Sequence, residues 1–282
     1  MSISIQTNVT SLVAQNNLSV NNMFQQNTIT QLTSGYRINK SGDDAAGLVI
    51  ANTYRNNLAE LNQGIQNANN GVAELQIMDG GLNNISNILD RLKTLATEAS
   101  SGTLPSGTGP TSINNEFNSL LAEIDRQAAN IGLSAATGAT AADGQYITTM
   151  SVWIGGAAEA TNAQVNVDLT GGAVDSASLG VTGEDLTTTA GAQTALADVN
   201  TAVQNLGAVQ GTVGAGENDL QYAIALAQSQ VTNFSAAQSA IRDTDVAAQA
   251  ANLTKAQVLQ QASMAAMAQA NSSSSAVLKL FQ

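Results

Sequence analysis

The side chains that carry most enzyme chemistry are missing from this chain. Its 282 residues include no cysteine and no histidine. Disulfides, thiol nucleophiles, Ser-His-Asp and Cys-His catalysis, and zinc sites built on thiolate or imidazole are therefore excluded. The remaining candidates are three carboxylate pairs, Asp43–Asp44, Glu184–Asp185 and Glu217–Asp219. A carboxylate pair can act as general acid and base or hold a metal ion.

The setting of these pairs does not favour catalysis. Asp43 and Asp44 come just before a long helical pattern, and neighbouring helical side chains point about 100° apart. Ser41 or Asp43 is instead expected to cap that helix, whose first turn favours carboxylates. The other two pairs lie in glycine-rich stretches and are interpreted as solvated loops. We predict no catalytic residue, no metal site and no cofactor, and hence a protein that is not an enzyme.

The stretch from Asp43 to Ala99 carries the longest periodic pattern. Its apolar residues recur in alternating steps of four and three, which is typical of a coiled-coil seam. The predicted seam consists of Tyr54, Leu58, Leu61, Ile65, Ala68, Val72, Leu75, Met78, Leu82, Ile85, Leu89, Leu92, Ala96 and Ala99. The pattern skips between Leu75 and Leu82: two three-residue steps, from Val72 to Leu75 and from Leu75 to Met78, adjoin there, which predicts a local overwinding. A continuous helix here would be about 85 Å long and needs partner helices; the alternative is an ordinary helical bundle.

Thin helical stripes mark both chain ends. Residues 1–34 have apolar residues at helical spacing among Asn and Gln, and the last segment starts with the capping sequence Asp243-Thr244-Asp245. Such helices bury too little to fold alone, so we predict that the two ends pair. The predicted seam of the last segment is Val246, Ala250, Leu253, Gln257, Gln260, Met264 and Met267. Gln257 and Gln260 either fix the register by hydrogen bonding or are tolerated beside a lumen wall.

The middle of the chain predicts two further helices and a hairpin. Apolar spacing favours a short helix over 111–130 and a long one over 192–241, the latter weakened by the glycines between Gly211 and Gly216. Alternation over 146–154 and 165–169 predicts two paired strands, with Trp153 on one face. A further strand piece is expected at 179–181.

Charge is distributed unevenly along the chain. The net charge is −12, and twelve acidic residues but only one basic residue, Arg126, lie between Glu116 and Asp219. The first 36 residues carry no charge, and from Val246 onward only Lys255 and Lys279 are charged. Nucleic acid is an unsuitable partner because its binding needs clustered Lys and Arg. We expect no membrane span and no cleaved signal peptide, because the chain lacks a long apolar run and a basic, then apolar, N-terminus.

Two motifs at opposite ends resemble bacterial flagellin. LTSGYRINKSGDDAAGLVIA (Leu32 to Ala51) is similar to the family's N-terminal signature, and SAIRDTDVAAQAANLTKAQVLQQASMAAMAQAN (Ser239 to Asn271) to its C-terminal one. The resemblance covers roughly residues 1–130 and 191–282. It implies a subunit that assembles head-to-tail into the hollow helical filament that bacteria rotate for swimming.

The resemblance and the patterns together predict the architecture. The fold class is mainly α: an elongated antiparallel helical bundle or coiled-coil rod formed by both chain ends, with a small β-hairpin insert. The expected domains are an inner terminal coiled coil of 1–42 with 243–282, and a helical rod of 43–136 with 191–242. Residues 137–190 form the hairpin and loop part of the rod, without a large outer domain.

Partners and location follow from the resemblance. It implies a homo-polymer, extracellular on the bacterial flagellum, exported without a cleaved signal peptide. The implied partners are the flagellar export apparatus, a secretion chaperone, the filament cap and the junction protein at the filament base. Polymerisation is assigned to the terminal seams, through Ile5, Val9, Leu12, Val20, Phe24, Leu253, Met264, Met267, Leu278 and Leu280.

The resemblance also implies an epitope for the flagellin-sensing Toll-like receptor. The family uses an Arg and a Leu on the long helix and a Glu on the next helix. They match Arg91 and Leu95 in LDRLKTLATE and Glu116 in INNEF. The alternative is an ordinary solvated face of the rod.

Three other functions compete with a filament subunit. A hook–filament junction protein resembles flagellin at both ends but would not form long filaments alone. An enzyme is disfavoured because the protease insert of some flagellins needs histidine for zinc. A secreted effector that binds a host helix would show no polymer.

Overall fold

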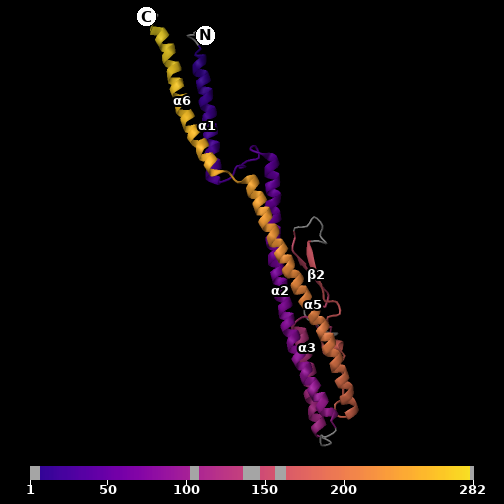
Figure 1. The fold of residues 1–282 in the computed structure, drawn as a ribbon. Coiled ribbons are helices and arrows are strands. Elements are labelled where there is room, and N and C mark those ends of the chain that lie inside the picture. The colour runs from indigo at the N-terminus through magenta and orange to yellow at the C-terminus, as the bar shows by residue number, and fades with distance from the viewer. Residues whose placement is uncertain (1–6, 102–107, 136–146, 156–162, 280–282) are drawn as a thin grey trace. The chain divides into compact units, whose positions relative to one another are not determined.

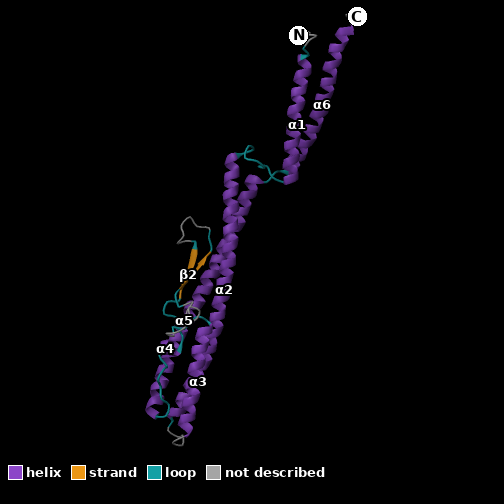
Figure 2. Ribbon diagram, turned by 180° about the vertical axis from the view of Figure 1, so that it is seen from behind, coloured by secondary structure: helices purple, strands orange, loops and turns teal. Residues whose placement is uncertain are grey.

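The computed structural model describes residues 7–101, 108–135, 147–155 and 163–279 (Figure 1). The elements in chain order are α1 (Val9–Ser34), α2 (Ala45–Ser100), α3 (Thr108–Asn130), β1 (Thr149–Trp153), β2 (Gln164–Asp168), α4 (Ser176–Leu179), α5 (Thr189–Arg242) and α6 (Val246–Lys279). The fold is therefore mainly α with one small antiparallel sheet, as the sequence predicted. Long helices dominate both views (Figure 2).

The described residues form two compact units. One lies within Met1–Leu58 and Thr232–Gln282, and the other within Ala59–Val231. The assignment of an inner coiled-coil domain and a rod domain stays a prediction. No described helix has an apolar stretch long enough to cross a membrane.

In the first unit, α1 and α6 pack side by side and antiparallel, which is the predicted pairing of the chain ends. Asn8 caps α1 by accepting a hydrogen bond from the backbone N–H of Ser11, and Gly35 ends it in the left-handed conformation (φ 74°). Asp245 caps α6, because its Oδ1 accepts from the N–H groups of Ala247 and Ala248. The capping sequence that begins the last helix is thus confirmed.

The two connectors of this unit are tied to each other. The N–H of Thr244 donates to the carbonyl of Gly35 at 2.9 Å, and the N–H of Arg37 donates to that of Arg242 at 2.7 Å. The guanidinium of Arg242 also lies 4.1 Å from the centre of the Tyr36 ring, within cation–π range. These contacts hold the end of α1 beside the start of α6.

The cap of α2 differs from the prediction. Asp44, and not Ser41 or Asp43, accepts from the N–H of Gly47 at 2.9 Å. The Asp43 carboxylate instead accepts from the N–H groups of Asn39 and Lys40, and these bonds hold its pKa below the ordinary value. The sequence placed the cap one residue early because adjacent carboxylates offer the same chemistry, and only the backbone path separates their roles.

The second unit contains the buried seam of α2, which corrects the predicted skip. Its buried line from Leu61 to Ala99 runs through 61, 64, 68, 71, 75, 78, 82, 85, 89, 92, 96 and 99, in alternating steps of three and four without interruption. Gly64 and Gly71 occupy this line where Ile65 and Val72 were predicted, and those two side chains are only half-buried. The predicted pair of adjoining three-residue steps is therefore absent from the described seam, because a glycine can hold a seam position without an apolar side chain.

Helix α3 is confirmed, and it begins three residues earlier than predicted. Its end packs on α2, because the side chain of Ile131 fills the space beside Gly81. Leu179 was expected in a strand piece, but it ends the short helix α4, which Gly180 terminates at φ 78°. Asp175 caps that helix by accepting from the N–H of Ser178, so the local capping outweighs the strand propensity.

The hairpin is confirmed, with β1 and β2 antiparallel and Val152 opposite Val165. Val152 and Val167 are buried, whereas the Trp153 side chain is 43% exposed. Helix α5 runs without a break through the glycines that were expected to weaken it. One of them, Gly216, is needed for close packing, because a Cβ there would lie 2.6 Å from Cγ1 of Val167.

Candidate assembly surface

The face of α1 that meets α6 is built mainly from small and polar residues. Its less exposed positions follow one another in steps of three and four, as in a coiled coil. They are Ser11, Ala14, Leu18, Asn21, Gln25, Thr28 and Leu32, and Asn22 and Gln31 beside this line are also half-buried. Only Ala14 and Thr28 among them are fully buried. The seam therefore contains few large apolar side chains.

The facing residues of α6 have the same character and correct the predicted seam. The less exposed positions follow the line Gln249, Leu253, Ala256, Gln260, Ser263, Met267 and Ala270, with Asn252 also half-buried beside it. Leu253, Gln260 and Met267 were predicted, but Val246, Ala250, Gln257 and Met264 are exposed. The prediction followed the larger apolar residues, whereas the helices pack through the small ones, which allow close approach.

Side-chain hydrogen bonds join the two helices across this seam. The amide Nδ2 of Asn21 donates to Oγ of Ser263 at 2.8 Å, and Nε2 of Gln260 donates to Oδ1 of Asn22 at 2.9 Å. The amide of Asn8 donates to the carbonyl of Ala270 at 2.9 Å. Gln260 thus forms a hydrogen bond across the seam, while Gln257 lies outside it.

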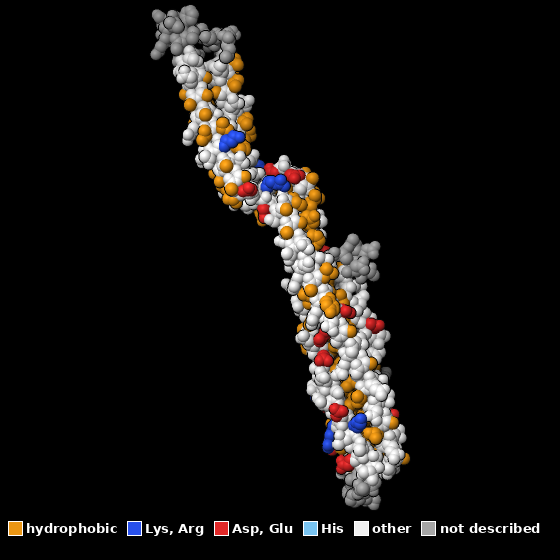
Figure 3. Space-filling view, viewed as in Figure 1, with side chains coloured by type: hydrophobic (Ala, Val, Ile, Leu, Met, Phe, Trp, Pro, Cys, Tyr) orange, Lys and Arg blue, Asp and Glu red, His pale blue; other side chains and the backbone are white. Residues whose placement is uncertain are grey.

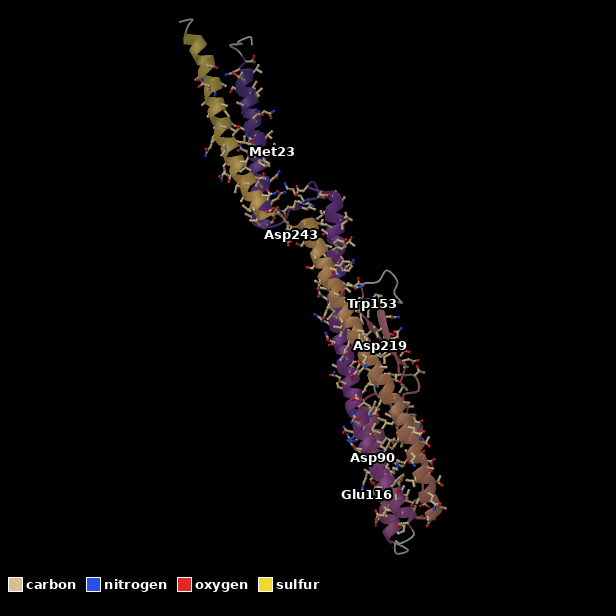
Figure 4. All side chains as sticks on the ribbon, in the orientation of Figure 1. Met23, Asp90, Glu116, Trp153, Asp219 and Asp243 are labelled. Atoms are coloured by element: carbon tan, nitrogen blue, oxygen red, sulfur yellow. The ribbon has the colours of Figure 1, made fainter. Side chains whose placement is uncertain are left out.

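Most of the described larger apolar residues of both helices lie outside the seam. Those that are more than a third exposed are Val9, Leu12, Val13, Val20, Met23, Phe24, Ile29, Val246, Val258, Leu259 and Met264. We call this set the terminal apolar face. Figure 3 shows apolar side chains along both helices, and Figure 4 labels Met23. Lys255 and Lys279 are the only charged residues in α1 and α6.

The residues predicted for polymerisation are divided by the structure. Val9, Leu12, Val20, Phe24 and Met264 belong to the terminal apolar face, not to the seam between α1 and α6.

The other predicted polymerisation residues lie elsewhere. Leu253 and Met267 are half-buried in the seam. Ile5 and Leu280 lie outside the described residues, and Leu278 lies in α6 without a described side chain. Their role in assembly stays a prediction.

Sequence reasoning missed two groups of this site. It did not assign Val13, Met23, Ile29, Val246, Val258 and Leu259 to the polymerisation set, nor Asn21, Asn22 and Ser263 to the seam. The signal was present: a regular heptad line from Ser11 to Leu32 consists mostly of small and amide residues, and most of the larger apolar residues lie off that line.

The three predicted receptor residues lie in the second unit. Nε and Nη2 of Arg91 donate to Oε1 of Glu116 at 2.8 and 2.6 Å, and both side chains are about half exposed, at 50% and 45%. Figure 4 shows Glu116 near the lower end of the bundle. Leu95 is buried, with 1% exposure. Only Arg91 and Glu116 therefore present side chains to solvent.

In the structure, the two carboxylates of each remaining pair do not act together. Glu184 interacts with Asp198 of α5; burial, followed by the hydrogen bond and charge of Asp198, raises the pKa of Glu184. Asp185 accepts from the hydroxyl and N–H of Thr187, and these bonds lower its pKa. Glu217 and Asp219 lie in the continuous helix α5, not in a loop. Within the described part of the chain, no group of three or more possible ligands gathers to hold a metal ion.

Comparison with known proteins identifies the family. The model of the bacterial flagellin N-terminal helical region matches residues 5–132, and that of the C-terminal helical region matches residues 196–281. The chain is 33% identical to the flagellar filament 30.7 kDa core protein of Treponema maltophilum, over 98% of this chain and 99% of that protein. It is 30% identical to a flagellin of Halalkalibacterium halodurans, over 99% of each.

Among solved structures, the chain is similar to the crystal structure of Bacillus cereus flagellin. The sequence identity is 28% and the TM-score 0.47, over 61% of this chain and 94% of that chain. Family models at both ends and relatives aligned over nearly the whole chain agree with the helical termini. The chain belongs to the bacterial flagellin family and is a structural subunit of the flagellar filament.

Proposed function

We propose that copies of this chain assemble head-to-tail into a hollow helical filament that serves as a propeller, and that neighbouring copies cover the terminal apolar face. The observation that carries this proposal is the inverted distribution of apolar residues on α1 and α6. Among the described residues of the two helices, eleven large apolar side chains are exposed, while the seam holds mostly small and polar residues. A helix pair that only had to be stable alone would place its large apolar residues inward.

The energetics favour assembly. Burying a Val, Leu, Ile, Phe or Met side chain contributes about 1.5–3 kcal/mol, so covering this face provides a large driving force. The near absence of charge on α1 and α6 means that close packing of copies needs little desolvation of charged groups. A head-to-tail contact that does not close into a ring produces a helical filament.

The location and accessory partners of the filament are part of the proposal. We infer an extracellular flagellar protein, exported without a cleaved signal peptide. Its partners are the flagellar export apparatus, a secretion chaperone, the filament cap and the junction protein at the filament base. Family membership supports these inferences. The proposed domains are the terminal coiled coil and the rod with its hairpin, as predicted from the sequence.

The experiment is polymerisation of the purified full-length chain, induced by salt or by filament seeds and imaged by negative-stain electron microscopy. The variant Val20→Asn with Met23→Gln makes two residues of the terminal apolar face polar. Its matched control, Val20→Ile with Met23→Leu, keeps both positions apolar.

Because 1.4 kcal/mol corresponds to a factor of ten, we expect the polar variant to raise the critical concentration at least about tenfold. The apolar control is expected to polymerise like the unchanged chain. Only monomers of the unchanged chain under all conditions would overturn the proposed function. Equal polymerisation of the polar variant would show that other residues make the contact.

We also propose that the monomer is recognised by the flagellin-sensing Toll-like receptor through Arg91 and Glu116. Both side chains are half exposed and joined by a charge-assisted hydrogen bond, so they present a fixed charged pair. The alternative is an ordinary solvated face, and receptor binding by the purified monomer distinguishes the two.

A further inference from the structure

We infer that the polar side chains between α1 and α6 fix the register of this helix pair, and thereby decide which residues of the two helices combine into one docking face for another copy. This inference rests on the proposed function. It concerns positioning residues, because Asn21, Asn22, Gln260 and Ser263 act through the apolar residues beside them and need not touch a neighbouring copy.

The apolar part of the seam carries little information about register. It consists of Leu18 and Leu32 on α1, Leu253 and Met267 on α6, and three alanines. If α6 slipped by one heptad, about 10 Å along its axis, small and medium apolar residues would again face each other. The apolar packing of a slipped pair would resemble that of the native pair. The packing free energy alone would therefore favour the native register only slightly.

The polar pairs do discriminate. The Asn21–Ser263 and Gln260–Asn22 bonds, at 2.8 and 2.9 Å, are partly buried and lie at the middle of the pair. A slip of one heptad would place Asn21 opposite Ala256 or Ala270 and Asn22 opposite Leu253 or Met267. A buried polar group without a partner costs about 1–3 kcal/mol. Polar residues at coiled-coil seams fix register and orientation in this way, at some cost in stability.

The register matters because the terminal apolar face is composite. The Asn21 amide lies 3.5 Å from the carbonyl oxygen of Leu259, and Phe24 follows Asn21 by about one turn, so this contact holds the exposed side chains of Phe24 and Leu259 close to the same level of the pair. A slipped pair would present these residues in a different combination, and a neighbour shaped to the native face would not fit.

The test replaces the polar pair and measures the register directly. Asn22→Leu with Gln260→Leu makes the seam apolar. The matched control, Asn22→Gln with Gln260→Asn, exchanges the two amides and keeps a hydrogen-bonding pair of the same combined length. Since the chain has no cysteine, spin labels at Asn16→Cys and Ala268→Cys, both exposed positions, report one distance between α1 and α6 in the full-length chain.

We expect one distance for the unchanged chain and for the exchanged control, each with the same critical concentration for filament formation. The Leu–Leu variant is expected to keep its helices at an equal or higher melting temperature, to show a second distance population, and to need at least about tenfold more protein to polymerise. Because the helices of this variant stay folded, a second distance together with weaker polymerisation would be caused by a changed register and not by unfolding.

Two outcomes would overturn the inference. One is a Leu–Leu variant with the single native distance and the native critical concentration. The other is an unchanged chain with no defined distance either as monomer or after assembly. If the unchanged chain gives a single distance but never polymerises, the proposed function fails, and the distances of the variants still decide whether the polar pairs set the register.

Discussion

The carbonyl group of Ile154 occupies the space that a Cβ atom on Gly64 would need. Val167 occupies the corresponding space at Gly216 of α5. The hairpin therefore lies directly against the backbone of two long helices, at points where neither helix has a side chain. Gly64 of α2 and Gly216 of α5 are thus contact residues and not weak points of the helices.

Replacing Gly64 by Ala should destabilise the protein. The added methyl group would meet backbone and not a flexible side chain, so α2 and β1 must separate, at a cost of about 1–3 kcal/mol or more. Gly80→Ala on the same helix is the control, because a Cβ there meets nothing within 4 Å. It should stabilise by about 0.5–1 kcal/mol. Urea unfolding of the full-length variants measures both changes in the free energy of unfolding. Equal changes for Gly64→Ala and Gly80→Ala would contradict the close contact at Gly64.

Replacing Asp44 by Ala should weaken the start of α2. Loss of the bond from the N–H of Gly47 is expected to cost about 1 kcal/mol, as for other N-caps. Amide hydrogen exchange at Gly47 and the unfolding free energy measure the local and global effects. Ser41→Ala should change stability by less than about 0.5 kcal/mol. If Ser41→Ala destabilised the protein more than Asp44→Ala, Ser41 would be the cap of α2, as the sequence predicted.

The Glu184–Asp198 pair should make stability depend on pH. The pKa of Glu184 is raised in the folded state, so the fold binds this proton more tightly than the unfolded chain does. Its contribution is fully present below the unfolded pKa, near 4.5, and is lost as pH rises through the folded pKa. Glu184→Gln should therefore stabilise the protein at pH 7, by at most about 0.5 kcal/mol because the pair is partly solvated, and have no effect at pH 3.

Unfolding free energies of this variant at pH 3 and 7 test the pair. Glu98→Gln makes the same change of charge at an exposed position of α2. If both variants shift stability equally at pH 7, the change in net charge explains the effect and the pair does not.

Binding of the monomer to the receptor should depend on the exposed Arg91. Replacing the buried Leu95 should mainly change stability. Arg91→Ala removes an exposed cation and is expected to reduce binding of the monomer by tenfold or more, with little loss of stability because the ion pair is exposed. Lys93→Ala, an exposed cation two residues away, is the control. Leu95→Ala should instead destabilise by about 2–5 kcal/mol, because this side chain is buried.

Surface plasmon resonance with the receptor ectodomain measures this binding, and circular dichroism confirms the fold of each variant. No binding by the unchanged monomer would contradict the recognition proposal. Equal loss in Arg91→Ala and Lys93→Ala would point to general charge attraction in place of the matched epitope.

The sequence by itself determined the long helices, the hairpin and the family. Periodicity and capping are local properties, so α2 and α6 begin and end close to the predicted residues. Tyr54 and Phe234, which both belong to predicted apolar stripes, are in contact: their rings stack with 5.6 Å between the ring centres. The end motifs are continuous stretches of chain, which is why they were sufficient to indicate flagellin.

Only the tertiary structure decided which face of each helix is covered. A sequence pattern follows the large apolar residues, and on α2 this placed Ile65 and Val72 in a seam that Gly64 and Gly71 occupy. On α1 and α6 it placed Val20 and Met264 inside, although the pair closes through Asn21 and Ser263. The reason is physical. How closely two helices approach depends on the size and shape of the side chains between them, which the pattern of one helix does not contain. A large apolar residue outside the seam is not covered within its own chain.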